Sequence, residues 1–288
     1  MEYQIITDSC CDLPLDIMKE YNIEVFNFVI SIENEELIDD MGLTFNKDQF
    51  FKRLKDGAIA STSQVNVHTY IEKFKQYIEK DKPVIYLAFS SELSGSYNNA
   101  VQAINILKEE YGTVEISIVD TRAASLGQGL LVYEAAKRKR EGMSLSDVVE
   151  WIEEVKNSVH SWVTVDDIKH LQRGGRISAT AATVGSILSI KPIIVMTSEG
   201  KLVPFSKVRG RKKSLHFLVD KTLEGIIEPE SQTIFIGHVG VLEDAEYVKE
   251  LLESRQKFKQ VVITSYGPTV ASHTGFGSLA VFSFGKEK

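Results

Sequence analysis

The residues best suited to bind a ligand lie in one short polar run: Ser90, Ser91, Ser94, Gly95 and Ser96. An apolar segment rich in strand-forming residues precedes this run, and apolar residues at helical spacing follow it. The pattern predicts a buried strand from Val84, a tight turn, and a helix that Gly112 ends. The start of such a helix has unpaired N–H groups and the positive end of the helix dipole. One serine would be enough for helix capping, and the run holds four, which favours a site for one anionic group.

Three other polar segments could contribute to a site. Ser61-Thr62-Ser63-Gln64 precedes a segment with helical periodicity and is interpreted as a second polar corner. Arg173-Gly-Gly-Arg176 places two arginines around paired glycines, where the backbone can approach a ligand closely. Ser272-His273-Thr274-Gly275, which is expected in a loop, offers one titratable ring beside hydroxyl groups.

A basic segment stands out in a chain whose formal net charge is −7. Five of the seven residues from Lys207 to Lys213 are Lys or Arg. They are consistent with a solvated strand end and equally with a patch for a phosphate or an acidic partner. The sequence leaves these two interpretations open.

Several kinds of site are excluded by spacing. No His or Cys cluster has the spacing of a metal site, so no metal is expected. The Gly127 and Gly275 segments each lack the third glycine of a dinucleotide fingerprint, and no P-loop or nucleophile elbow occurs. Ser94, His273 and Asp8 can be written as a catalytic triad, but sequence alone gives this grouping no geometric support.

Composition places the chain among globular proteins, with 43% hydrophobic and 25% charged residues in 288. The negative net charge argues against a broad nucleic-acid surface. Asp8, Asp12 and Asp16 interrupt the first segment, so no signal peptide is expected, and no apolar run reaches membrane-spanning length. The two cysteines are adjacent, which gives no disulfide framework and favours the reducing cytoplasm.

The order of expected elements indicates an α/β fold with two α/β domains, residues 1–160 and 161–288. In the first, strands and helices alternate, which predicts a mainly parallel sheet flanked by helices. Its strands are expected over residues 3–7, 25–32, 84–89 and 114–119, with an acidic loop after the second. In the second, a hairpin around Ser198-Glu-Gly200 and two strand–helix units predict a mixed sheet and helices. A small-residue helix is expected over residues 178–190.

Six motifs in order make the chain resemble a known family. They are Thr7-Asp-Ser9 with Asp12-Leu13, Thr62-Ser-Gln64, Ser90-Ser-Glu-Leu-Ser-Gly95, Gln172-Arg-Gly-Gly-Arg-Ile177, Ile190-Lys-Pro-Ile193 and His273-Thr-Gly275. The ordered set resembles the DegV family, whose members are similar to the fatty-acid-binding subunit of the bacterial fatty acid kinase. The resemblance runs from about residue 5 to residue 277. Phe276 departs from it, since the family usually has proline there.

The resemblance implies one long-chain fatty acid in a tunnel between or beneath the two domains, and no other cofactor. It implies ligand-binding roles for Thr62, Ser63, Ser94, Gly95, His273 and Thr274, of which Thr62 and Ser94 bond the carboxylate. Arg209, Arg173 and Arg176 are expected near the head group or the partner. That partner would be the catalytic subunit of a fatty acid kinase, which forms the acyl phosphate used in phospholipid synthesis, so this chain would be a carrier and co-substrate and not itself an enzyme.

Two other functions remain open from the residues themselves. Ser94 could be the nucleophile of an acyl hydrolase. The chain could also be a lipid-responsive regulatory protein, which senses lipid or binds nucleic acid through Lys207–Lys213.

Overall fold

The first half of the chain builds a four-stranded parallel sheet, called sheet A. A computed structural model describes residues 2–178 and 189–288. The strand order in sheet A is β2-β1-β6-β7. Every residue of β1 and β6 is buried, as in parallel strands covered on both faces. The strands are β1 (Gln4–Asp8), β2 (Glu24–Phe26), β6 (Val84–Ala88) and β7 (Ile116–Asp120).

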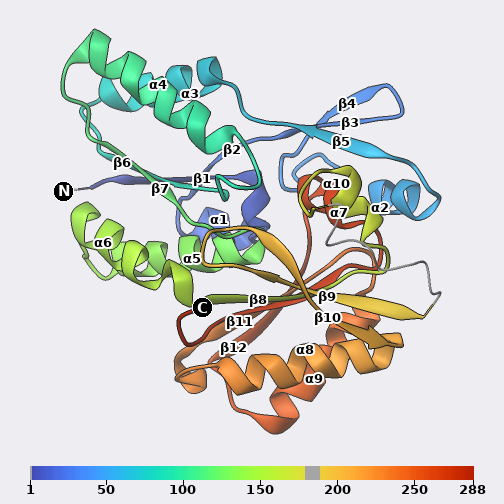
Figure 1. Ribbon diagram of the computed structural model, residues 1–288. Helices are drawn as coiled ribbons and strands as arrows, with labels where there is room; N and C mark the ends of the chain where they lie inside the picture. Colours follow the sequence, from blue (N-terminus) through green and yellow to red (C-terminus); the bar gives the residue numbers. More distant parts are fainter. Residues whose placement is uncertain (1, 179–188) are drawn as a thin grey trace.

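Helices cover both faces of sheet A (Figure 1). Two pack on its upper face in that view, α3 (Val67–Ile78) and α4 (Ser96–Tyr111). The lower face is covered by α5 (Leu126–Arg140) and α6 (Leu145–Val155), with α1 (Leu15–Glu20) and the 3₁₀ turn η1 (Ser9–Cys11) nearby.

The second half builds a six-stranded mixed sheet, sheet C, in the order β10-β9-β8-β13-β11-β12. Only β11 and β12 are parallel among these paired strands. Helices α8 (Arg211–Gly225) and α9 (Leu242–Arg255) cover the outer face. The strands are β8 (Val159–Thr164), β9 (Ile190–Met196), β10 (Leu202–Arg209), β11 (Thr233–His238), β12 (Gln260–Ser265) and β13 (Leu279–Phe284), with 3₁₀ turns at Lys156–Ser158 and Pro229–Ser231.

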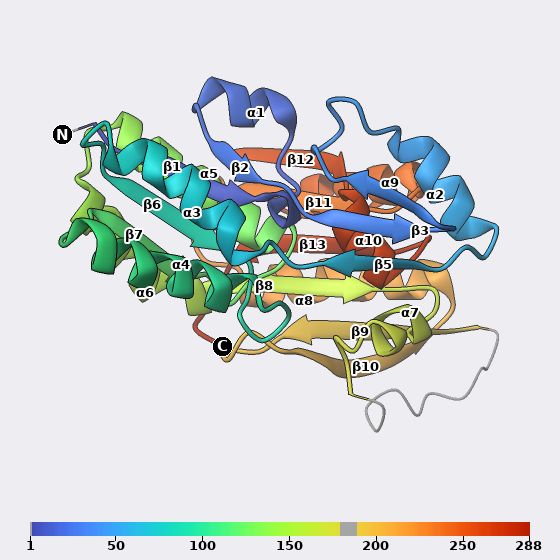
Figure 2. The same ribbon diagram turned by 90° about the horizontal axis from the view of Figure 1, so that it is seen from above.

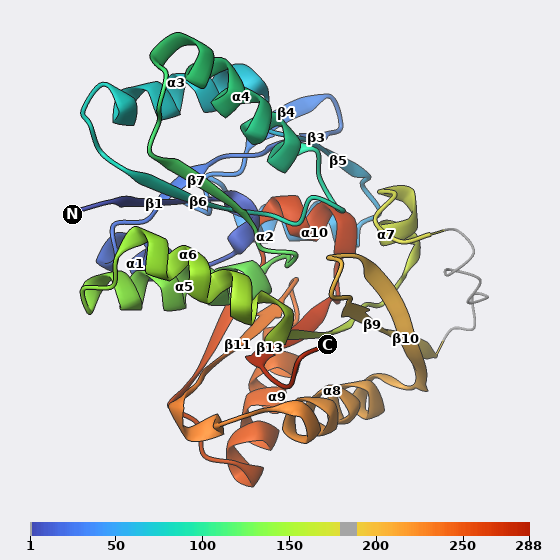
Figure 3. The same cartoon turned by 60° about the vertical axis from the view of Figure 1, so that its left-hand side comes forward.

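Helix α5 lies between the two sheets and contacts both, which Figure 3 shows from the side. Gly127 and Gly129 allow this close packing. A Cβ on Gly127 would come 3.1 Å from the hydroxyl of Ser161 in sheet C, and one on Gly129 would come 2.5 Å from the carbonyl oxygen of Cys11. The largest hydrophobic cluster accordingly contains residues from both sheets. The expected α/β fold, with a helix-flanked parallel sheet and a mixed sheet, is confirmed.

A third, antiparallel sheet was not expected. It has the order β4-β3-β5 and consists of β3 (Val29–Ile32), β4 (Glu35–Ile38) and β5 (Ala60–Ser63). Helices α2 (Lys47–Lys55) and α10 (Pro268–Thr274) pack near it, and the short α7 (Lys169–Arg173) lies beside α10 (Figure 2).

Three sequence-based expectations were therefore wrong. The single strand over 25–32 is two strands in different sheets, because Phe28 is buried between them and its N–H donates to Ser9 Oγ. The acidic loop after it is β4, an edge strand with exposed glutamates. The polar corner Ser61–Gln64 is mostly strand β5.

The segment containing His273 was also misassigned, since it is the last turn of α10 and not a loop. Pro268 at the start of this helix is compatible with the first turn. The helix expected over residues 178–190 falls largely outside the described residues, and Ile190 begins β9.

Candidate functional site

A cavity lies where the carboxyl ends of the sheet A strands meet the inner face of sheet C. Parallel α/β sheets commonly bind ligands at this end of their strands. The β6–α4 loop, the η1 turn, β5 and α10 enclose the cavity from one side, and strands of sheet C from the other. Its lining residues are Cys10, Phe28, Thr62, Gln64, Phe89, Leu93, Ser94, Ala124, Ser125, Ser161, Val163, Leu171, Arg176, Ile194, Met196, Leu202, Tyr266, Thr269, Val270, His273, Thr274 and Phe282.

The cavity is a narrow, mostly apolar slot. The volume open to the centre of a water molecule is about 70 Å³. Alternation along the strands of sheet C supplies one apolar wall, with Val163, Ile194 and Phe282 facing inward. A small cavity with a mostly apolar lining suits a hydrocarbon chain.

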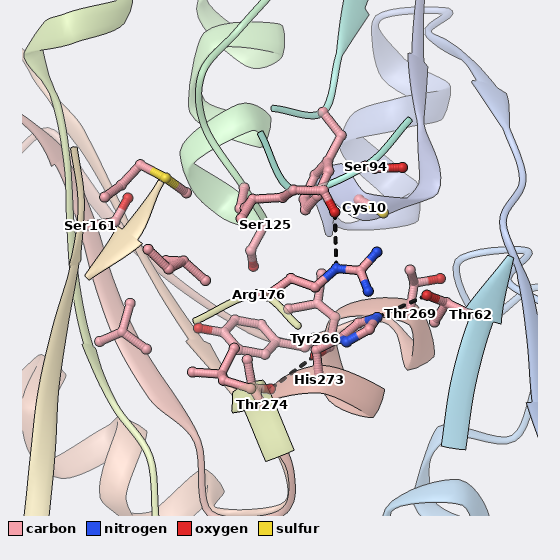
Figure 4. Close-up of a pocket in the computed structure, with 18 of the residues that line it drawn as sticks. Cys10, Thr62, Ser94, Ser125, Ser161, Arg176, Tyr266, Thr269, His273 and Thr274 are labelled. Carbon is pink, nitrogen blue, oxygen red and sulfur yellow. Dashed lines mark hydrogen bonds between the residues drawn. The ribbon is translucent and has the colours of Figure 1, made fainter. Parts of the chain in front are cut away.

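Polar groups gather at one end of the slot, on the side of β5 and α10 (Figure 4). The hydroxyl of Thr62 and Nε2 of His273 are 2.8 Å apart. Burial, with a smaller contribution from Arg176, lowers the pKa of His273 to about 4, so its ring is neutral near pH 7. Nδ1 of the ring faces Gly174, where a Cβ would come within 2.2 Å.

Ser94 lies at the start of α4 in the same part of the cavity. Its hydroxyl donates to Ser96 Oγ at 3.0 Å and accepts from the Ser96 backbone N–H at 3.2 Å. This is local capping of the helix start. The other serines of the run have different partners: Ser90 donates to the Gly200 carbonyl, and Ser91 to the Asp120 carboxylate. Of the four serines, only Ser94 lines the cavity, and Ser96 is its hydrogen-bond partner.

Arg176 supplies the positive charge of the cavity. It is the one Lys or Arg among the lining residues that the structure describes. Its Nε donates to the carbonyl oxygen of Leu93 at 2.9 Å and one Nη donates to Gly174, so the side chain links α7 to the β6–α4 loop. Burial lowers the pKa of Arg176, yet a guanidinium stays charged at any physiological pH.

Of the remaining predicted site residues, Thr274 lines the cavity and the other four do not. Ser63 is exposed, because alternation along β5 turns it away from Thr62. Gly95 is not among the lining residues, although a Cβ there would meet the Gln64 side chain, which does line the cavity. Arg173 and Arg209 are exposed and outside the lining, and Arg173 contacts His170. Thr274 lines the cavity, but its hydroxyl donates to the Val270 carbonyl within α10.

Two buried carboxyl groups that were not predicted as site residues hold the wall in place. Asp12 accepts hydrogen bonds from Ser125 Oγ at 2.5 Å and from the Gly267 N–H at 2.7 Å. It thereby joins η1 to the starts of α5 and α10. Asp39 accepts from the hydroxyl of Thr269 at 2.6 Å. Burial raises the pKa of both carboxyl groups, that of Asp12 to about 8. Asp12 belongs to the first of the ordered motifs, and this membership was the signal in the sequence that could have identified it as a residue of the site.

The described residues show no metal centre and no membrane span. No group of three or more His, Cys, Asp or Glu side chains in residues 2–178 and 189–288 is arranged to hold a metal ion. No helix in those ranges is long and apolar enough to cross a bilayer. Cys10 and Cys11 are both free and buried.

Comparison with known proteins gives one family across almost the whole chain. The family described as "Uncharacterised protein, DegV family" matches residues 2–286. A DegV domain-containing protein of Clostridium perfringens is 44% identical over 100% of this chain and 99% of its own length.

Solved structures of the same fold include proteins described as fatty-acid-binding. A DegV family protein from Thermus thermophilus, described by its fatty acid binding, has a TM-score of 0.88 at 25% identity, covering 99% of this chain and 100% of that one. A fatty acid binding DegV family protein from Streptococcus agalactiae has a TM-score of 0.84 at 30% identity, covering 99% of both chains. A DegV family protein from Ruminococcus gnavus, refined with vaccenic acid, has a TM-score of 0.87 at 26% identity, covering 97% and 99%.

Proposed function

The chain belongs to the DegV family, and from this premise we propose that it binds one long-chain fatty acid in the cavity between sheets A and C. The observation that carries the proposal is the polarity of the slot. It is apolar along sheet C and has hydroxyl, imidazole and guanidinium groups at the opposite end. This distribution matches a molecule with one anionic end and a long hydrocarbon chain.

In this proposal the carboxylate lies among Ser94, Thr62 and Arg176. The two hydroxyls can each donate a hydrogen bond after a rotation about one bond. Arg176 supplies a charge that partly offsets the cost of burying the carboxylate. His273 orients the Thr62 hydroxyl, since the two are already paired in the structure.

The tail provides most of the binding free energy. About fifteen methylenes at roughly 0.8 kcal/mol each correspond to about 12 kcal/mol of gross burial. Association and ordering remove a large part of that value. A hydrogen bond from a hydroxyl contributes only about 1 kcal/mol net. The tail therefore sets the affinity, and the hydroxyls set which way round the lipid lies.

We further propose that this protein presents the bound acid to a separate fatty acid kinase in the cytoplasm. The kinase would transfer the γ-phosphoryl group of ATP to a carboxylate oxygen, which yields the acyl phosphate and ADP, and this chain would retain the acyl group. The family resemblance supports this role, and the grouping of Ser94 with His273 and Asp8 as a triad gains no support from the geometry. The hydrogen bond of His273 Nε2 goes to Thr62 and not to Ser94, and its Nδ1 faces Gly174 where a triad would need a carboxylate.

A comparison of ligands with the same tail tests the proposal. Octadecanoic acid should bind the delipidated protein more tightly than its methyl ester, which has no anionic oxygen, in a competition assay. Equal affinities would contradict a carboxylate site. Turnover of an acyl ester by the protein would favour the hydrolase instead, and salt-dependent DNA binding would favour the regulatory protein.

A further inference from the structure

Two residues of the slot, Ser161 and Met196, also line a second pocket on the outer side of sheet C. The volume of this second pocket open to the centre of a water molecule is about 600 Å³, far more than in the slot. Its apolar surface includes Trp162 and Phe205, and its rim carries Lys221, Glu224, Lys286, Glu287 and Lys288. The second pocket has no part in the function proposed above.

The shared residues stand at a fork in sheet C. The pairing of β8 with β9 includes three residue pairs and ends at Trp162 with Val195. Ser161 and Met196 would form the next pair, but Ser161 pairs only with Phe282 of β13 and Met196 only with Leu202 of β10. The backbone hydrogen bonds that would seal the sheet therefore stop at this point.

The two faces of the sheet meet at the fork. Ser161 faces the slot, on the side of the cavity away from Thr62 (Figure 4). Trp162, the next residue, faces the other way and packs against Phe205, with ring centroids 5.1 Å apart, and against Phe217 of α8. The residues that the slot and the second pocket share thus lie at the end of the slot remote from the Thr62 and His273 side.

Unpaired polar atoms also mark this place. Ser161 is 5% exposed, and its hydroxyl has no hydrogen-bond partner among the described residues. Nε1 of Trp162 is likewise buried without a partner there. If the slot were closed at this end, carbon atoms alone would normally line it, because an unpaired buried polar atom costs free energy. Such atoms are expected where a ligand or water enters.

We propose that the far end of a long acyl chain passes through the fork between Ser161 and Met196 and lies in the second pocket against Trp162 and Phe205. The inference rests on the proposed function, since it needs the carboxylate at the Thr62 end. It assigns this protein a preference for chains longer than the slot itself can hold. Met196 is well suited to the fork because its unbranched, flexible side chain can move aside.

Fluorescence can locate the end of the chain. The sequence has two tryptophans, so Trp151→Phe leaves Trp162 as the only one. Bromine quenches a tryptophan only at short range. In this variant, ω-bromoeicosanoic acid should quench the Trp162 emission, whereas ω-bromododecanoic acid should bind with little quenching because its bromine stays inside the slot.

A charge at the exit provides the second readout. Phe205 is 52% exposed, so Phe205→Asp should not disturb the core. This substitution should lower the affinity for docosanoic acid by about tenfold, which corresponds to the loss of roughly two buried methylenes. The affinity for dodecanoic acid should stay unchanged. Ile106→Asp, at an exposed position of α4, is the matched control and should change neither affinity.

The outcomes separate the two proposals. Two results together would overturn the passage and leave fatty acid binding intact. In the first, the parent, Phe205→Asp and Ile106→Asp proteins have the same affinities for dodecanoic acid and for docosanoic acid. In the second, the long bromo acid does not quench the Trp162 emission. A parent protein that binds no fatty acid of any length would overturn both.

Discussion

In the proposed site, Thr62 and Ser94 offer neutral hydroxyl groups to the carboxylate, where a lysine or arginine would bind it more tightly. A neutral donor would leave the carboxylate oxygens more available for the proposed attack on ATP. The structure adds Arg176 on one side, held by the carbonyl oxygens of Leu93 and Gly174. This residue therefore contributes positive charge without freedom to follow the ligand.

Removal of either hydroxyl is expected to weaken lipid binding modestly. Thr62→Ala and Ser94→Ala should each lower the affinity for octadecanoic acid by about fivefold, the value of one hydrogen bond. Ser63→Ala is the matched control, since Ser63 lies on the same strand but is exposed on the other face. A competition binding assay measures the affinity of all three variants for octadecanoic acid. Unchanged affinity in both cavity variants would place the carboxylate elsewhere.

His273 is expected to act as a neutral ring. Burial and Arg176 lower its pKa to about 4, so it carries no charge between about pH 5.5 and pH 8. Acyl phosphate formation with the kinase should therefore show no inflection near the usual histidine pKa of about 6.5 that can be assigned to His273. His273→Asn should retain fatty acid but lower the rate at every pH. An inflection in the parent that this variant lacks would contradict the neutral ring.

At the scale of elements, helix α5 and the η1 turn connect the two sheets around the cavity. Asp12 is central, because its carboxyl group bonds both Ser125 before α5 and Gly267 before α10. Burial raises its pKa to about 8, while an unfolded chain has a value near 3.9. Between about pH 4 and pH 8 the unfolded state loses a proton that the folded state keeps, so stability falls as pH rises.

Asp12→Asn should remove this dependence and keep both hydrogen bonds, with the amide donating to Ser125 and accepting from Gly267. The free energy of unfolding of the variant, relative to the parent, should rise from about pH 4 to about pH 8, by at most about 1.4 kcal/mol per pH unit. Urea unfolding across this range measures the difference. A difference that stays constant, or changes in the opposite direction, would contradict the buried protonated carboxyl group.

The sequence predicted the elements that have clear periodicity or clear caps. The β6–turn–α4 unit and α2, whose cap Asn46 accepts from the Gln49 N–H, were predicted because local residues determine them. The β3–β5 sheet was missed because its strands are short and its edge carries glutamates and serines. The contact of Thr62 with His273 spans 211 positions, so no local pattern could reveal it. Arg176 was assigned to the head group or the partner, and only the fold shows that it lines the cavity.

At the scale of the whole molecule, the proposed kinase would have to reach a buried carboxylate on a protein whose formal net charge is −7. We propose that the basic segment Lys207–Lys213 is the docking surface for this kinase, although not every cation in it is exposed. Arg211 pairs with Asp244 at 2.7 Å and lies 3.7 Å from Asp166. Lys212 and Lys213 are exposed, as is Arg209.

Charge reversal at the exposed lysines should slow encounter with the kinase. Lys212→Glu with Lys213→Glu should raise the apparent KM for this protein as the kinase's substrate, mostly at low salt, because rim charges act on association. Arg209→Ala should likewise raise the apparent KM with lipid still bound, because Arg209 is exposed and lies outside the cavity lining. Lys257→Glu with Lys259→Glu, just before β12, is the charge-matched control. If both test variants show the kinetics of the parent at every salt concentration, the basic segment is a solvated surface and not a docking surface.

The most direct test of the central claim is the lipid content of the protein purified from cells. Organic extraction followed by mass spectrometry should recover one long-chain fatty acid per chain, and the Thr62→Ala and Ser94→Ala proteins should release theirs faster on exchange with labelled acid. Protein that carries no fatty acid as purified, and takes up none when octadecanoic acid is added, would contradict the account.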